Sequence, residues 1–252
     1  MLEVTRAFGL HTVNALLKKN PGRLRGLMIQ QGRDDERIRA LVGLADQAGI
    51  RVQRRAAAEL DALAGGNRHQ GVVAEIEPAT AQGEGALDDL LQAAGNHRPP
   101  LLLVLDGVQD PHNLGACLRT ADACGVTAVI VPRDRASGLT PVVRKVASGA
   151  AESVPLIQVV NLARTLRWLK AHEIWIVGTD EAAEQSLYAA DFAAPTAIVM
   201  GAEGQGMRRL TREACDVLVN IPMLGIVESL NVSVATGVLL FEALRQRSAL
   251  HK

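Results

Sequence analysis

From Pro99 onward, short and continuously apolar runs alternate with segments of helical periodicity, and this alternation limits the possible folds more than any other feature of the chain. The runs that we predict to be strands are Leu101–Leu105, Val126–Val131, Pro155–Val159, Ile174–Gly178, Ala197–Met200 and Val217–Ile221. Helices are predicted between most of them, including Leu114–Cys124, Leu162–Ala171 and Val232–Arg247. Strands that lack polar alternation are buried on both faces, as in a parallel sheet covered by helices. We therefore predict an α/β domain with a parallel sheet over residues 99–252.

Residues 1–77 are predicted to form a second, smaller α/β domain. Its predicted elements are the helices Thr12–Lys19 and Asp35–Ala48 and the strands Leu24–Gln30, Ile50–Val52 and Gly71–Ile76. Residues 78–98 mix proline, glycine and acidic residues around one short helix, a composition typical of linkers. The sequence thus predicts domains at 1–77 and 99–252, joined by a linker at 78–98.

Composition is that of an ordinary globular protein, with 48% hydrophobic and 21% charged residues. No apolar run approaches the roughly 20 residues of a membrane span, and the first residues do not resemble a signal peptide. The chain has 3 cysteines. Cys117 and Cys124 are seven positions apart and so share a helical face, which favours core packing over metal ligation. We expect a cytoplasmic protein that needs neither a membrane nor a metal.

The net charge of the chain is zero, which gives no indication of nucleic-acid binding. The distribution of charge along the chain does favour such binding. Residues 1–76 carry 12 Lys/Arg against 8 Asp/Glu, and Arg51, Arg54 and Arg55 lie close together. Such a patch suits contact with phosphates, although an ordinary solvated face would look the same. With only 2% aromatic residues, a wide base-stacking platform is not expected.

In parallel α/β folds, ligands bind beyond the C-terminal ends of the strands. The first loop at such an end runs from Asp106 to Gly115 and leads into a helix that contains Arg119. Asn113 could simply cap that helix, and Arg119 could be a solvated surface residue. A guanidinium beside a strand-end pocket is, however, also well placed to bind phosphate or ribose oxygens.

The second loop, Gly201–Gly206, has glycines that permit close approach of the backbone to a ligand. The main alternative function for such a glycine-rich loop is binding of a nicotinamide dinucleotide. The glycine order of such a site would be GxGxxG, whereas the order here is GxxGxG, and Glu203 would repel a pyrophosphate. No Walker A sequence occurs in the chain, so nucleotide hydrolysis by that motif is excluded as well.

The third loop, Ile221–Ser233, leads into the C-terminal helix. Ser229 and Asn231 flank the start of that helix and bring hydroxyl, amide and free backbone N–H groups together. Within the helix, an apolar stripe recurs at helical spacing and favours simple core packing over an interface; it consists of Val234, Val238, Phe241 and Leu244.

The three loop regions resemble, in order, the three motifs of the SpoU/TrmH family of RNA methyltransferases in the SPOUT class. The matching runs are LDGVQDPHNLGACLRTADACGV, IVMGAEGQGM and IPMLGIVESLNVSVATG. FGLHTVNALL and HQGVVAEI look like parts of the RNA substrate-binding domain carried by some members. The resemblance implies S-adenosylmethionine-dependent methylation of a ribose 2′-hydroxyl. The subgroup that it resembles acts on a guanosine in the peptidyl-transferase region of 23S rRNA.

The resemblance further implies a C-terminal trefoil knot and a homodimer whose active site borrows residues across the interface. Topology rules alone would argue against a knot. By motif position, the residues that resemble the cofactor-binding set are Gly201, Ile221 and Leu230, to which we add Met223 and Gly178. Those that resemble the catalytic and substrate-positioning set are Asn113, Arg119, Glu203, Ser229 and Asn231.

Arg119 is a poor general base at neutral pH, because a guanidinium has a pKa above about 12. We expect it to orient a phosphate and stabilise developing negative charge, while Glu203 or a phosphate oxygen receives the proton. The expected RNA partner is 23S rRNA or another structured RNA. Three alternative functions stay open: a tRNA 2′-O-methyltransferase, a non-catalytic RNA-binding or ribosome-assembly factor on the same scaffold, and a small-molecule methyltransferase. The last of these leaves the basic N-terminal domain unexplained.

Overall fold

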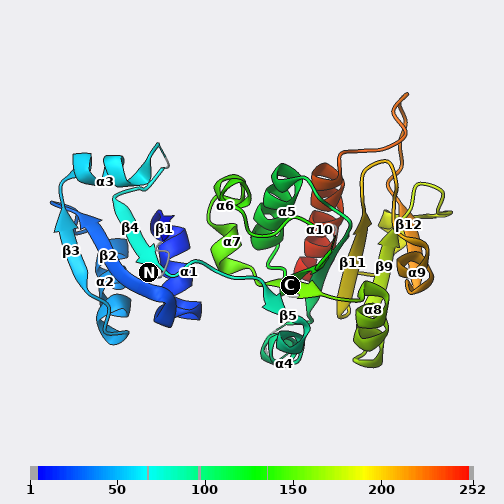
Figure 1. The fold of residues 1–252 in the computed structure, drawn as a ribbon, viewed down its shortest axis with the longest axis horizontal. Helices are drawn as coiled ribbons and strands as arrows, with labels where there is room; N and C mark the ends of the chain where they lie inside the picture. Colours follow the sequence, from blue (N-terminus) through cyan, green and yellow to red (C-terminus); the bar gives the residue numbers. More distant parts are fainter. Residues whose placement is uncertain (1–4, 67, 96–97, 135, 250–252) are drawn as a thin grey trace. The chain divides into compact units, whose positions relative to one another are not determined.

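The computed structural model describes residues 5–66, 68–95, 98–134 and 136–249 (Figure 1). The chain divides into two compact units, Met1–Ala79 and Thr80–Lys252. Within the described residues, no helix is both long and apolar enough to cross a membrane.

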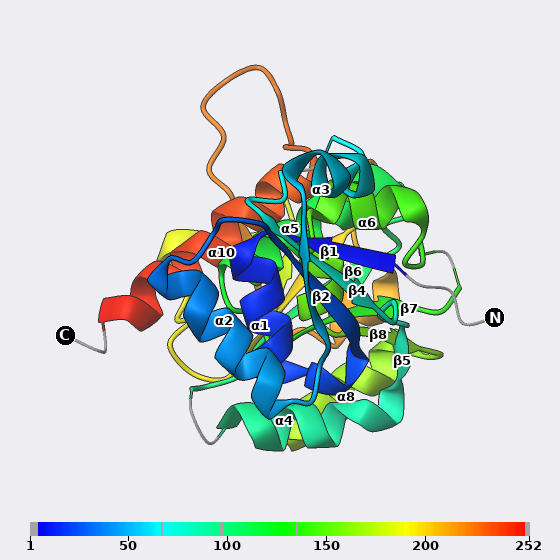
Figure 2. The same cartoon turned by 90° about the vertical axis from the view of Figure 1, so that its left-hand side faces the viewer.

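The first unit is a four-stranded sheet with helices on both faces. Its strands, in the spatial order β1-β4-β2-β3, are β1 (Thr5–Phe8), β4 (Val72–Ile76), β2 (Leu24–Gln30) and β3 (Val52–Arg55). Its helices are α1 (Leu10–Lys19), the 3-10 turn η1 (Pro21–Arg23), α2 (Glu36–Gln47) and α3 (Ala57–Ala64). Helices α1 and α2 pack side by side on one face, and α3 covers the other (Figure 2).

Most of this unit agrees with the sequence prediction, but the third strand begins two residues later than expected. Ile50 donates its N–H to the carbonyl of Ala45 at 2.8 Å and closes the C-terminus of α2, so it packs in the core without belonging to a strand. Pairing with β2 begins only at Val52. The prediction also missed β1 and α3.

The second unit contains the predicted parallel sheet, with every strand pair parallel. Its spatial order is β10-β12-β9-β11-β6-β7-β8-β5. In chain order the strands are β5 (Gln82–Gly83), β6 (Leu101–Asp106), β7 (Ala128–Pro132), β8 (Leu156–Val159), β9 (Trp175–Thr179), β10 (Gln185–Ser186), β11 (Thr196–Gly201) and β12 (Val217–Asn220). The six predicted apolar runs correspond to β6, β7, β8, β9, β11 and β12.

Helices cover both faces of this sheet, which explains why its strands are apolar without alternation (Figure 1). The helices on one face are α5 (Pro111–Ala123), α6 (Pro141–Ala147), α7 (Ala150–Ser153) and α10 (Val232–Ala249). Those on the other are α4 (Leu87–Gly95), α8 (Leu162–Ala171) and α9 (Arg209–Glu213). Two short 3-10 turns complete the unit, η2 (Glu84–Ala86) and η3 (Leu187–Ala189).

The predicted linker at 78–98 needs correction, because most of it is folded into the second unit. Strand β5 pairs with β8, and Leu87 is fully buried in the core beneath α8. The Glu84 carboxylate accepts hydrogen bonds from Thr165 at 2.7 Å and from Arg164 at 2.9 Å. Composition failed here because these partners lie about eighty residues away in sequence. The unit boundary falls between Ala79 and Thr80.

The order of the strands creates the functional edge of the sheet. Strand β11 lies between β6 and β9, so that Gly201 pairs with Asp106 in register although the strands are far apart in sequence. Because all the strands are parallel, the loops that follow β6, β11 and β12 leave the sheet at the same edge. This is the edge where such folds bind ligands. The trefoil knot stays a prediction.

Candidate active site

A buried carboxylate fixes the glycine-rich loop that follows β11. Asp106 ends β6 and is 1% exposed. It accepts hydrogen bonds from the Arg208 backbone N–H at 2.9 Å and from Arg208 Nε at 2.6 Å. Ala202 and Gly206 also exchange two backbone hydrogen bonds, which folds the loop back on itself. Asp106 and Arg208 were not among the predicted site residues, although a carboxylate at the end of an apolar strand was the signal available.

Gly201 is required by close approach of the backbone rather than by its backbone angles. A Cβ atom at this position would lie 2.2 Å from the carbonyl carbon of Gly206 and 2.4 Å from the backbone nitrogen of Met207. Neither is a flexible side-chain atom that could move aside. Any side chain here would therefore open the loop 201–207.

Three polar side chains from the three loops form one hydrogen-bonded cluster, which we call the Asn–Glu–Asn cluster: Asn113, Glu203 and Asn231. One carboxylate oxygen of Glu203 accepts from the Asn231 amide at 2.5 Å, the Asn113 amide at 3.2 Å and the Val232 N–H at 3.3 Å. Asn231 also donates to the carbonyl oxygen of Asn113 at 3.0 Å. The structure thus brings together three of the predicted catalytic residues.

The cluster sits at the N-terminus of the longest described helix, α10. Asn231 caps this helix, because its side-chain oxygen accepts from the Ser233 N–H at 2.9 Å. A carboxylate next to a helix N-terminus is stabilised by the helix dipole and by free N–H groups. Asn113, by contrast, is not the cap of α5. Asp110 caps that helix through the His112 N–H, and Asn113 is 8% exposed with its amide turned to Glu203.

A cavity of about 700 Å³ opens beside the cluster, a volume within the range of small-molecule sites. Its walls come from the ends of β9, β11 and β12 and from the start of α10. The predicted cofactor residues that line it are Gly201, Ile221, Met223 and Leu230. The predicted catalytic residues that line it are Glu203, Ser229 and Asn231. Ser229 is exposed there.

Three predicted site residues do not line this cavity: Asn113, Gly178 and Arg119. Asn113 hydrogen-bonds to Glu203, which does line it. Gly178 is packed inside the sheet, where a Cβ atom would approach Cys215 Sγ to 2.6 Å and Leu218 Cδ2 to 2.9 Å. Gly178 thus has a packing role, and its neighbour Thr179 lines the cavity. The assignment of Gly178 to the cofactor stays a prediction. Arg119 lies on the exposed side of α5, and no described residue forms a hydrogen bond or ion pair with its side chain.

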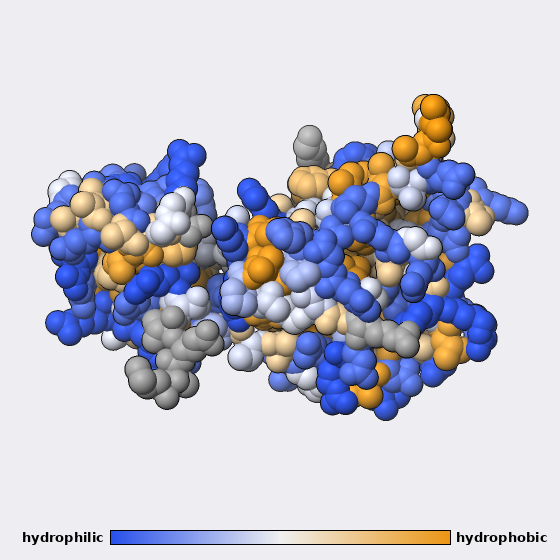
Figure 3. Space-filling view, turned by 45° about the horizontal axis from the view of Figure 1, so that its top comes forward, coloured by the Kyte–Doolittle hydropathy of each residue, from blue (hydrophilic) through white to orange (hydrophobic). Residues whose placement is uncertain are grey.

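The segment 221–231 projects from the second unit (Figures 1 and 2). Leu224 and Ile226 are fully exposed, and Figure 3 shows the tip as a hydrophobic projection. On α10, Val234 and Phe241 are 52% and 53% exposed. The prediction that this stripe is simple core was wrong for these two residues, because the opposite side of α10 faces the sheet. A helix surface of this kind is typical of an interface.

The thiols offer no reactive nucleophile at neutral pH. Burial raises the pKa of Cys117 and of Cys124 to about 11. Burial and the nearby Asp216 raise the pKa of Cys215 to about 12. As expected from their spacing, Cys117 and Cys124 are core residues. Within the described part of the chain, no group of His, Cys, Asp and Glu side chains is arranged to hold a metal ion.

Comparison with known proteins identifies two family domains. Residues 100–241 match the SpoU rRNA Methylase family, and residues 6–82 match the family described as RNA 2′-O ribose methyltransferase substrate binding. A 23S rRNA (guanosine-2′-O-)-methyltransferase RlmB from Pseudomonas syringae pv. tomato is 56% identical and covers 100% of both chains. The protein of the same name from Yersinia pestis is 55% identical over 95% of this chain and 96% of its own.

Solved structures agree with these matches. The SpoU methyltransferase AviRb from Streptomyces viridochromogenes, in complex with the cofactor AdoMet, is 26% identical, with a TM-score of 0.69. The alignment covers 98% of this chain and 91% of AviRb. A TrmH/SpoU tRNA modifying enzyme from A. aeolicus is 32% identical, with a TM-score of 0.57, over 67% of this chain and 85% of its own. The strand-end site and these matches lead to one identification: the chain belongs to the SpoU rRNA methylase family.

Proposed function

We propose that this chain methylates the ribose 2′-hydroxyl of a guanosine in 23S rRNA, with S-adenosylmethionine as methyl donor. The observation that carries the proposal is its 56% identity, over the full length of both chains, to an enzyme of that name. The Asn–Glu–Asn cluster beside a ligand-sized cavity supports it. We further propose that the target lies in the peptidyl-transferase region and that the enzyme works in the cytoplasm.

The cavity residues fit such a donor. The bound donor supplies an activated methyl group, so the chain must hold it, position the hydroxyl and handle one proton. Ile221, Met223 and Leu230 offer apolar surface to a flat base, while the loop at Gly201 offers backbone groups. The absence of a side chain at Gly201 lets this loop fold tightly at the cavity wall.

Glu203 is the group best placed to receive the proton of the ribose hydroxyl. Its Oε1 atom accepts three hydrogen bonds within the protein, whereas its Oε2 atom accepts none from the described residues. The side chain is therefore held by one oxygen while the other stays available to an incoming hydroxyl. Glu203 can keep the proton or pass it to a phosphate oxygen, and the exposed Ser229 hydroxyl lines the same cavity.

We propose that Arg119 acts in the cavity of a second copy of the chain. Its guanidinium is exposed, without a protein partner among the described residues, and does not line the cavity of its own chain. The exposed Val234 and Phe241 of α10 offer apolar area for a homodimer. In such a dimer Arg119 orients the target phosphate and stabilises the developing negative charge.

The first unit is proposed to capture the RNA. It holds the basic surplus of the chain and matches a substrate-binding family. Arg37, Arg39 and Arg51 are exposed and form no ion pair with another described residue, so they are free to meet phosphates. Arg55, by contrast, is already paired with Glu59.

The proposal is tested with S-adenosylmethionine carrying a labelled methyl group. The purified protein is incubated separately with undermethylated 23S rRNA and with undermethylated tRNA, and the RNA is then hydrolysed in alkali. A 2′-O-methylated ribose resists this cleavage, so the label should appear in an alkali-resistant dinucleotide that begins with guanosine, from 23S rRNA only. Label in tRNA alone, or label released as a base-methylated mononucleotide, would refute the proposed substrate or the proposed position.

A further inference from the structure

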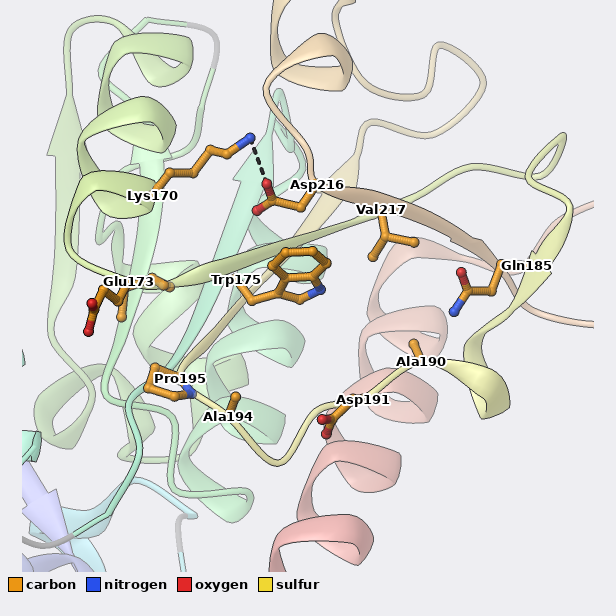
Figure 4. Close-up of a pocket in the computed structure, with 11 residues that line it drawn as sticks. Lys170, Glu173, Trp175, Gln185, Ala190, Asp191, Ala194, Pro195, Asp216 and Val217 are labelled. Carbon is orange, nitrogen blue, oxygen red and sulfur yellow. Dashed lines mark ion pairs between the residues drawn. The ribbon is translucent and has the colours of Figure 1, made fainter.

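A second cavity, of about 610 Å³, lies at the end of the parallel sheet that is opposite to the candidate active site (Figure 4). It is bordered by Ile174 and Trp175 at the start of β9, by Pro195 before β11 and by Asp216 before β12. It therefore lies at the N-terminal ends of parallel strands, whereas the candidate active site lies at their C-terminal ends. Neither the proposed reaction nor the predicted site residues make use of it.

The segment that forms one wall of this cavity, residues 190–195, is held rigidly by α10. Gln246 donates to the carbonyl of Ala190 at 3.0 Å and accepts from the N–H of Phe192 at 2.9 Å. Arg247 donates to the carbonyls of Phe192 and Ala194 at 2.8 and 2.7 Å. Burial lowers the pKa of Arg247 to about 10, and its donors point to carbonyl groups. The wall is thus preformed.

The cationic side chain that lines the cavity is already neutralised. Lys170 forms an ion pair with Asp216, with Nζ and Oδ1 2.7 Å apart. The other oxygen of Asp216 accepts from the N–H of Ile176 at 2.8 Å. This pair ties α8 to the sheet and leaves neither charge free for a ligand.

The groups that stay available are an aromatic ring, an amide and two carboxylates. Trp175 is 47% exposed, and Figure 4 shows its indole ring in the middle of the cavity, between Asp216 and Asp191. The side chains of Gln185 and Glu173 have no hydrogen-bond partner among the described residues. Asp191 uses Oδ1 to accept from the N–H of Ala193 at 2.8 Å, which leaves its second oxygen available.

We infer that this cavity binds an arginine side chain from a basic segment of a partner protein. A guanidinium is planar and cationic, so it stacks on an indole face while its N–H groups donate to carboxylate and amide oxygens. Trp175, Asp191 and Gln185 supply these three features around one preformed hollow. A nucleic-acid strand is the less suitable occupant, because its phosphates would meet the carboxylates of Asp191 and Glu173.

The test measures binding of a fluorescein-labelled peptide of alternating arginine and serine by fluorescence anisotropy. Trp175→Ala should weaken binding by at least about fivefold, the loss expected for a partly desolvated cation–π contact. Asp191→Asn keeps the acceptor for Ala193 but removes the charge, so it should weaken binding as well. Asp134→Asn is the matched control, because it removes a carboxylate that follows the C-terminal end of β7. It should bind the peptide like the unchanged protein.

Two further measurements locate the peptide and identify its chemistry. The chain has 2 tryptophans, so Trp168→Phe leaves Trp175 as the sole indole, and the peptide should quench its fluorescence. A lysine–serine peptide should bind more weakly, and a glutamate–serine peptide should not bind. Methyl transfer by Trp175→Ala should stay normal, which verifies that the variant is folded. Equal peptide affinity in Trp175→Ala and the unchanged protein, or quenching of Trp175 by an RNA oligomer alone, would overturn the inference.

Discussion

Asn231 donates an amide hydrogen to the side-chain carbonyl of Asn113 at 3.0 Å, across a sequence separation of 118 residues. Both amides also donate to Glu203, so that loops from three separate strand ends share one hydrogen-bonded centre. Such a centre forms only when the ends of β6, β11 and β12 have come together. It therefore links folding of the second unit directly to formation of the candidate active site.

The Asn–Glu–Asn cluster should behave as one unit in mutagenesis. Asn113→Ala and Asn231→Ala should each reduce single-turnover methyl transfer by about a hundredfold, because each leaves the Glu203 carboxylate misplaced. The double variant should lose little more than either single variant, since the two amides act through the same carboxylate. Transfer rates at saturating cofactor measure this coupling. Losses that multiply in the double variant would mean that the two residues act independently.

Gly201→Ala should weaken cofactor binding. The added Cβ would lie 2.2 Å from a backbone atom of Gly206, so the loop must open at the cavity wall. We expect an affinity loss of at least about tenfold, measured by calorimetry with S-adenosylmethionine, since opening this loop should cost one or two kcal/mol. Gly225→Ala is the control, because a Cβ there meets no atom within 4 Å. If both variants bound the cofactor normally, close packing at Gly201 would have no part in binding.

Arg119→Ala should abolish methyl transfer and leave cofactor affinity within about threefold of normal. Arg119 does not line the cavity of its own chain, whereas a charge-assisted contact made in the transition state is worth roughly 3 kcal/mol, or about a hundredfold in rate. Arg119→Lys keeps the charge but lacks the planar guanidinium that can donate two parallel hydrogen bonds, so its rate of methyl transfer should also fall substantially. Single-turnover rates and calorimetry separate the two effects. A near-normal rate in Arg119→Lys would exclude the bidentate role.

A fragment comprising residues 80–252 should be more stable than one comprising 99–252. The shorter fragment loses β5, which pairs with β8, and the fully buried Leu87. Removing a buried leucine alone costs about 2–5 kcal/mol. Urea unfolding of both fragments measures the difference. Equal stability would restore the view that residues 80–98 are a linker. The longer fragment should keep its affinity for the cofactor and lose affinity for RNA.

The apolar strands of the second unit were predictable because helices cover both faces of the sheet and each strand carries its signal within four to six residues. Helix α8 was predicted to the residue, since its Asn161 cap and apolar face are local features too. Strand β5 and the fold of residues 80–95 were not predictable, because they are stabilised by β8 and α8, whose sequences lie far away.

The candidate site was predictable to a similar extent. Loop position indicated Glu203 and Asn231, whereas the close packing that requires Gly201 depends on how the loop folds back against Gly206. The ion pair between Asp106 and Arg208 also depends on the pairing of β11 with β6, which no local sequence pattern predicts. The close packing of Gly178 was not predictable either, because a glycine at a strand end serves packing as readily as ligand approach.

The central claim is that one methyl-transfer site contains the Asn–Glu–Asn cluster of one copy and Arg119 of another. It is tested most directly by mixing two inactive variants, Arg119→Ala and Asn231→Ala, under conditions that exchange subunits. In a mixed dimer one site carries both substitutions and the other carries neither, so mixing should restore about a quarter of normal methyl transfer per site. Each variant incubated alone is the control and should stay inactive. Mixtures no more active than the separate variants, although exchange has demonstrably occurred, would contradict the shared site.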